Sequence, residues 1–172
     1  MRMNLLAVAI AGLAAGCAGA QSPGPKAVAQ LEATKGNTAT GTVTFEQRGG
    51  KVVVTAEVRG LKPNAEHGFH VHEKGDCSSG DGMSTGGHFN PKGAPHGQPG
   101  HGPHHSGDIP ALKADANGAA KLVWEGDELT VTDGPLSVVG RGVIVHRDPD
   151  DYKTQPTGNA GPRLACGVVK RM

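Results

Sequence analysis

Short runs in which apolar and polar residues alternate dominate the chain. In the run 51–60, every second residue from Val52 to Val58 is apolar. This period of two is typical of a half-buried β-strand. The runs 27–33 and 41–47 alternate in the same way, and helical periodicity is weak throughout. The pattern predicts an all-β domain.

Turn residues join the runs into a larger pattern. Gly49-Gly50 links 41–47 to the next strand as a hairpin, and Asn117-Gly118 predicts a second hairpin over 111–125 with a type I′ turn. The remaining strands are expected at 68–72, at 136–146 with a kink at its glycines, and at 165–170. We therefore expect a Greek-key β-sandwich or flattened barrel of about eight antiparallel strands.

Two long segments lack any alternation. Residues 73–110 contain mainly Gly, Pro, Ser, Asp and His, and residues 147–163 form a second such stretch. Loops of this length in a compact domain are usually functional or disordered. The pattern thus predicts two long functional loops on the sandwich.

Composition narrows the class of protein. The 172 residues suit one domain with a leader, and the net charge of +1 without charged blocks argues against nucleic-acid binding and a polybasic membrane tether. The 28 glycines follow no collagen period, which favours a loop-rich domain over disorder. Five of the nine histidines lie between His88 and His105, and this density suggests metal binding.

The N-terminus predicts export. Residues 1–20 combine Arg2, a short apolar segment and small residues suited to a peptidase, as in a secretion signal. A lipoprotein signal is the alternative, with Cys17 as the lipidated first residue, although Leu13 is one position too far from it. Both alternatives stay open. Residues 21–26 are then a tether, and residues 27–172 form the domain.

Export also bears on location and on the cysteines. We expect the chain in the periplasm, or anchored in a membrane and facing the periplasm, with membrane contact only through a lipid on Cys17. Cys77 and Cys166 then remain as an even pair in a compartment where disulfides persist. The alternative is two unrelated buried thiols.

The segment HGFHVHE, 67–73, carries the first chemical signal. Strand parity places His70 and His72 on one face, whereas Phe69 and Val71 point into the core. His67 has the opposite parity, so we expect it to make a structural hydrogen bond. Taken alone, the pair could be ordinary strand histidines.

Further candidate ligands follow along the chain. The motifs GGHFNP, APHG, HHSGD and GVIVH contribute His88, His96, His104, His105, Asp108 and His146. Imidazole suits copper and zinc, and one carboxylate among imidazoles suits zinc. Metal ligation could order a polar, glycine-rich loop, although such a loop could also bind metal loosely while solvated.

These motifs, together with HGFHVHEKGDC, GRGVIVH and GNAGPRLACGVV, occur in the order and nearly at the spacings of the copper/zinc superoxide dismutases. The chain resembles a bacterial exported member of that family from about residue 27 to 170. The resemblance implies a copper site and a zinc site that share His88. The implied copper ligands are His70, His72, His88 and His146; the implied zinc ligands are His88, His96, His105 and Asp108.

The family motif H-x-G-D selects His105 over His104, and neither His104 nor His101 matches a family ligand. The resemblance further implies that Asp150 links a copper-site histidine to a zinc-site histidine and that Arg163 lies beside the copper. It also implies a disulfide between Cys77 and Cys166 that ties the first long loop to the last strand.

The implied activity is dismutation of superoxide, a small anion, with a copper ion, a zinc ion and His88 and Arg163 as catalytic residues. Family members of this type occur as monomers and homodimers. The alternative is a periplasmic copper/zinc-binding or buffering protein on the same fold. Arg163 beside an open copper position is the feature that distinguishes the enzyme from a buffer.

Overall fold

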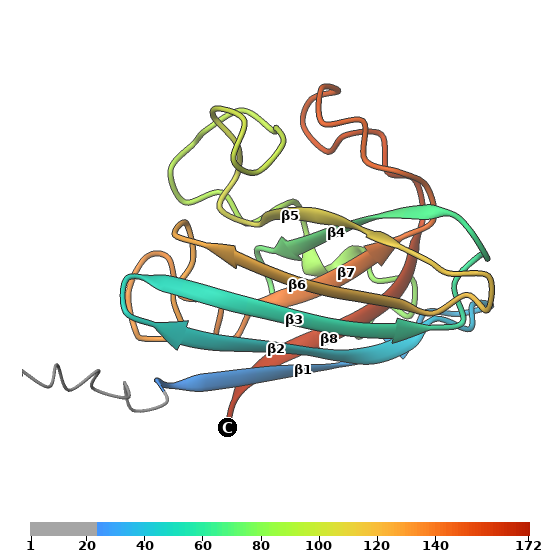
Figure 1. Cartoon of the computed structure of the whole chain (residues 1–172), viewed down its shortest axis with the longest axis horizontal. Helices are drawn as coiled ribbons and strands as arrows, with labels where there is room; N and C mark the ends of the chain where they lie inside the picture. The colour runs from blue at the N-terminus through green and yellow to red at the C-terminus, as the bar shows by residue number, and fades with distance from the viewer. Residues whose placement is uncertain (1–23) are drawn as a thin grey trace, which may run out of the picture.

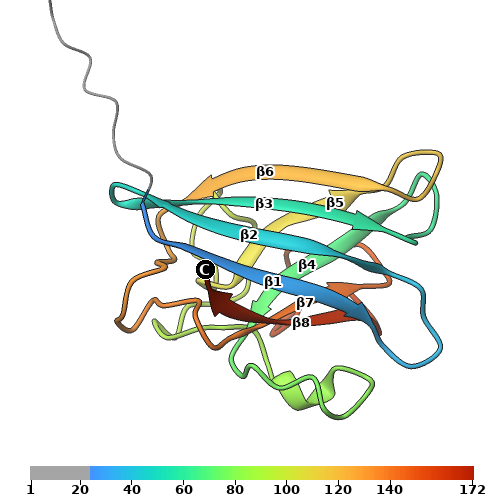
Figure 2. The same ribbon diagram turned by 90° about the horizontal axis from the view of Figure 1, so that it is seen from below.

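A computed structural model describes residues 24–172, so the predicted signal, Cys17 and the first half of the tether (21–23) lie outside the described residues. Eight strands form one nearly closed antiparallel barrel of two layers (Figures 1 and 2). The strands are β1 (Lys26–Ala33), β2 (Thr40–Arg48), β3 (Lys51–Arg59), β4 (Glu66–His72), β5 (Asp108–Lys113), β6 (Ala120–Gly126), β7 (Gly142–His146) and β8 (Arg163–Arg171). This confirms the all-β class and the number of strands.

The strand order is β5-β4-β7-β8-β1-β2-β3-β6. The first three strands follow one another as neighbours, and β8 returns from the end of the chain to lie beside β1. The other crossovers pair β3 with β6 and β4 with β7, as a Greek-key arrangement requires. Within 24–172, no helix has the length and apolarity needed to cross a bilayer.

The inward-facing apolar side chains of the strands form the core between the two layers. In β3, Val52, Val54 and Ala56 are fully buried while their sequence neighbours are not. The inward-facing valines pack with Phe45 of β2 and Phe69 of β4. Burial of such apolar side chains is the main favourable term in folding. Alternation therefore indicated correctly which face of β1, β2 and β3 is buried, whereas β4 and β7 are buried on both faces.

The predicted hairpin over 111–125 is wrong. β5 and β6 lie at opposite ends of the strand order, because β5 pairs with β4 and β6 pairs with β3. The connecting turn is tight, with Gly118 N–H donating to the Asp115 carbonyl, but only Gly118 and not Asn117 has a positive φ. A type I′ turn would need both. A turn signal marks chain reversal; it does not choose the strand's partner.

The predicted strand 136–146 is shorter than expected. Only β7, from Gly142, is a strand, and residues 136–141 belong to a loop held by the Gly140 N–H to Val169 carbonyl bond. The two long loops span 73–107, which includes the short 3₁₀ turn η1 (Met83–Thr85), and 147–162. Both rise on the same side of the barrel (Figure 1). All nine histidines lie on β4, in the first long loop or on β7.

Candidate metal centre

Four buried histidines form the first cluster: His70 and His72 from β4, His88 from the first loop, and His146 at the end of β7. One nitrogen from each ring lies within 4.8 Å of those of the others. The antiparallel pairing of β4 with β7 brings the two strands together, and a bridge between His72 and His88 adds the loop. The parity argument that placed His70 and His72 on one face is confirmed.

Hydrogen bonds orient each ring of the first cluster. Nδ1 of His72 donates to the Gly86 carbonyl at 2.9 Å, and Nδ1 of His146 donates to the Gly161 carbonyl at 3.1 Å. Nε2 of His70 faces Asp150 at 2.7 Å. These bonds place the proton on the outer nitrogen of each ring and leave a lone pair on the inner one.

The inner nitrogens fit a metal ion. Nδ1 of His70 and Nε2 of His72, His88 and His146 are buried without a hydrogen-bond partner. Burial, reinforced by the neighbouring rings, lowers the pKa of His72 and His146 well below the ordinary value, so these rings are neutral. Leaving buried acceptors unpaired is unfavourable unless something else occupies them. A cation bound by four imidazoles satisfies all of them.

The second cluster contains His88, His96, His105 and Asp108, all buried. Oδ1 of Asp108 lies 2.9, 3.1 and 3.5 Å from Nδ1 of His88, His96 and His105. The Nδ1 atoms of His88 and His105 are 3.4 Å apart. Zinc with four ligands at about 2.0–2.1 Å has tetrahedral edges of about 3.3 Å. The four ligand atoms thus already lie at the spacing of a zinc tetrahedron.

The carboxylate of Asp108 is held in place by the first loop. Its Oδ2 accepts from the backbone N–H groups of Gly97 and His105 at 3.2 and 2.9 Å. Burial opposes ionisation, but the hydrogen bonds from the three histidines outweigh it and keep the pKa of Asp108 far below its usual range. The group is therefore an anion, as a metal ligand must be.

His88 belongs to both clusters, and Asp150 joins them a second time. Nε2 of His88 faces the first cluster and its Nδ1 faces Asp108. Asp150 places one oxygen 2.7 Å from Nε2 of His70 and the other 2.9 Å from Nε2 of His96. One imidazole and one carboxylate therefore link the two adjacent clusters.

The sequence profile described as copper/zinc superoxide dismutase (SODC) matches residues 39–169. A superoxide dismutase (Cu-Zn) of Candida glabrata is 46% identical over 152 residues, covering 84% of this chain and 96% of that protein. The superoxide dismutase (Cu-Zn) of Yarrowia lipolytica matches with the same identity and coverage. The chain belongs to the copper/zinc superoxide dismutase family.

One solved structure has a similar fold. The crystal structure of the clock protein EA4 has a TM-score of 0.78 and 41% identity, covering 88% of this chain and 97% of that chain. Members of the family use copper and zinc, and the two clusters found here could hold both metals.

Arg163 begins β8 beside the first cluster of this dismutase fold. Its guanidinium donates to the Gly82 carbonyl and Thr85 Oγ1 at 2.6 and 2.7 Å, and to the Gly86 carbonyl at 2.8 Å. The Gly86 carbonyl also accepts from His72, so one backbone group links the arginine to the cluster. Burial lowers the pKa of Arg163, but an arginine remains charged at neutral pH.

The expected disulfide joins Cys77 in the first loop to Cys166 in β8, with Cα atoms 5.9 Å apart. It ties the segment that carries the carbonyl acceptors of Arg163 to the strand that carries Arg163 itself. Loop and arginine are thus held to one another both covalently and by hydrogen bonds.

The remaining histidines lie outside both clusters. His67 is fully buried, and its Nδ1 pairs with the His146 carbonyl at 2.9 Å, which confirms the structural hydrogen bond expected for it. The rings of His101 and His104 hydrogen-bond to nearby backbone carbonyls, those of Pro99 and His105. The structure thus brings together the seven predicted ligand residues, with His88 in both clusters, and leaves these three histidines aside.

Apart from Asp150, which the family resemblance implied, the groups that orient the ligands could not be predicted from the sequence. The carbonyls of Gly86 and Gly161 belong to the backbone, which carries no residue-type signal. Gly158 covers the contact between Asp150 and His96 so closely that a Cβ would lie 1.8 Å from the Asp150 oxygen. Gln155 hydrogen-bonds the backbone of His96. Only the folding of the second loop over the first reveals these contacts.

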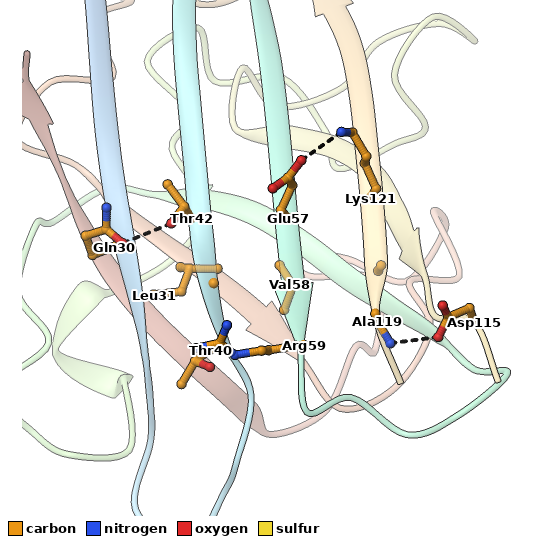
Figure 3. A pocket seen from close by; sticks show the side chains of 12 residues that line it. Gln30, Leu31, Thr40, Thr42, Glu57, Val58, Arg59, Asp115, Ala119 and Lys121 are labelled. Atoms are coloured by element: carbon orange, nitrogen blue, oxygen red, sulfur yellow. Dashed lines mark hydrogen bonds and ion pairs between the residues drawn. The ribbon is translucent and has the colours of Figure 1, made fainter. Parts of the chain in front are cut away.

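A hollow of about 540 Å³ lies away from both clusters, on the outer face of β1, β2, β3 and β6 (Figure 3). Its polar side chains pair with one another, as Glu57 does with Lys121 at 2.7 Å and Gln30 with Thr42 at 2.9 Å. It contains no histidine, and we assign it no chemistry.

Proposed function

We propose that this protein converts superoxide to oxygen and hydrogen peroxide, with copper in the first cluster and zinc in the second. The observation that carries the proposal is the set of four buried, unpartnered ring nitrogens that face one another at His70, His72, His88 and His146. Their geometry leaves a metal ion as the natural partner, and family membership names the chemistry.

The donor sets support this distribution of the metals. Four imidazoles without a carboxylate suit copper. Three imidazoles with Asp108 at tetrahedral spacing suit zinc, which has no redox chemistry and would hold His88 in place. When bound, copper supplies the one-electron chemistry that dismutation needs.

The chain's own residues bind the substrate and handle the proton. Arg163 uses three of its five N–H groups on the loop, which leaves its Nε–H and one further N–H for a small anion such as superoxide. Nε2 of His88 faces the first cluster and can take up a proton there, while Nδ1 stays in the second cluster. That proton can then pass to the peroxide product.

Activity and metal content together test the proposal. We expect one copper and one zinc per chain in the purified protein, and loss of most dismutase activity in His146→Ala. His101→Ala, which alters a histidine outside both clusters, is the matched control and should keep full activity. Equal turnover by His146→Ala and the unaltered protein would exclude the copper assignment, and a fully active preparation that contains only zinc would do the same.

We also propose that the chain is the exported bacterial type, with residues 1–20 as its signal or with Cys17 as a lipidated first residue. The support is the N-terminal pattern and a disulfide of the kind that persists outside the cytosol. Mass spectrometry of the mature N-terminus tests it. A diacylglyceryl-modified Cys17 or a start near Gln21 would support export, whereas an intact Met1 in the cytosol would refute it.

A further inference from the structure

The side-chain amide of Gln155 pairs with the backbone of His96. Its Oε1 accepts from the His96 N–H at 2.8 Å, and its Nε2 donates to the His96 carbonyl at 2.9 Å. The amide therefore satisfies the same two groups that a neighbouring β-strand would. The two residues lie 59 positions apart in sequence, in different loops.

The second loop contacts His96 at a third point. Asp150, five residues before Gln155, faces Nε2 of the His96 ring at 2.9 Å. The second loop thus holds both the backbone and the ring of His96. In this orientation Nδ1 of His96 lies 3.1 Å from Oδ1 of Asp108. The segment around His96, GAPHGQPG at 93–100, is rich in glycine and proline and lies in no helix or strand. Much of the restraint on His96 therefore comes from the second loop.

We propose that Gln155 is a positioning residue for zinc: its amide clamp holds His96 in place as a ligand and slows the release of the metal. This inference rests on the proposed zinc site in the second cluster. Gln155 lies at an exposed position, so water competes for its hydrogen bonds and the effect is moderate. Loss of both bonds should speed zinc release by about tenfold, because each contributes modestly.

The test compares the metal-loaded protein with Gln155→Met, which keeps the length of the side chain but neither donates nor accepts a strong hydrogen bond. Zinc release into a chromogenic chelator should be about tenfold faster in the variant. Cobalt(II) placed in the second cluster gives a second measurement, because its visible spectrum reports ligand geometry. We expect a shifted cobalt spectrum and an unchanged melting temperature of the metal-free protein.

Thr154→Val is the matched control. It removes a hydrogen bond to Asp151 within the same loop but no contact with His96. The clamp is supported if Thr154→Val releases zinc at the wild-type rate while Gln155→Met releases it faster. Equal release from wild type and Gln155→Met with the same cobalt spectrum overturns it, and so does equally fast release from Thr154→Val. A wild-type protein that takes up neither zinc nor cobalt refutes the zinc site itself.

Discussion

Nε2 of His96 lies 2.9 Å from Oδ1 of Asp150, a residue of the other long loop. The second oxygen of the same carboxylate reaches His70 in the first cluster. Asp150 therefore orients one ligand of each metal site. Replacing a carboxylate that orients a ligating histidine in this way typically lowers metal affinity or activity about 10- to 100-fold.

We predict that Asp150→Asn lowers zinc affinity about 10- to 100-fold. The asparagine amide carries no negative charge and has only one acceptor oxygen, so it cannot accept hydrogen bonds from both rings as the carboxylate does. Competition with a chelator of known affinity measures this. Asp148→Asn is the control, since Asp148 is a half-exposed carboxylate in the same loop that pairs with Arg147. Equal zinc affinity in the two variants would contradict the orienting role.

Gly158→Ala should destabilise the protein through the same contact. Gly158 has a φ of +66°, and its added Cβ would lie 1.8 Å from Oδ1 of Asp150. Gly93 offers a matched control because its φ is +65° but its surroundings are open. The left-handed backbone alone costs about 1–2 kcal/mol.

Gly93→Ala should therefore lower the free energy of unfolding by about that amount without affecting zinc. Gly158→Ala should lower it further and should also release zinc faster. Denaturant unfolding and chelator kinetics on both variants measure the difference. Identical results for the two substitutions would mean that backbone strain alone is responsible.

Zinc uptake should release a proton from His96. Burial opposes charging of this ring, but Asp108 and Asp150, one at each nitrogen, outweigh it and raise the pKa of His96 to about 9. In the metal-free protein both nitrogens are therefore protonated at pH 7, and zinc must displace the Nδ1 proton. The raised pKa of His96 in the folded state also contributes to the stability of the metal-free protein. This contribution is complete below about pH 6.5 and is lost as the pH rises through 9.

Calorimetric titration with zinc at pH 7, in buffers of different ionisation enthalpy, should show release of about one proton from His96. The release should disappear above pH 9, and Asp150→Asn should reduce it at pH 7 because one of the two stabilising carboxylates is gone. Binding heats that do not depend on the buffer at pH 7 would rule out a protonated His96.

Arg163→Lys should lower dismutase activity about tenfold or more without loss of copper. The guanidinium makes three hydrogen bonds to the loop while keeping two N–H groups free, and a lysine ammonium, with three donors, cannot do both. Activity measured against copper content at several superoxide concentrations checks this. Full activity in the lysine variant would show that charge alone is sufficient.

Local pattern determined much of the fold and the ligand set. Alternation along β3 indicated its buried face, and the single valine between His70 and His72 placed both rings on the same side. Such properties depend only on backbone geometry over a few residues. The ligands themselves were predicted through motifs that resemble those of the family, and the structure brings all of them together.

Only the tertiary structure decides which segments that are distant in sequence contact one another. The turn at Asn117-Gly118 is real, yet β5 and β6 pair with different strands because the chain passes there from one layer of the barrel to the other. Likewise, no sequence signal links Gln155 or Gly158 to His96, since their contacts arise where two irregular loops meet. The sequence by itself determined most of the strands and the metal-binding residue types. The tertiary structure decided which groups besides Asp150 orient those residues, because contacts between distant loops depend on how the whole barrel closes.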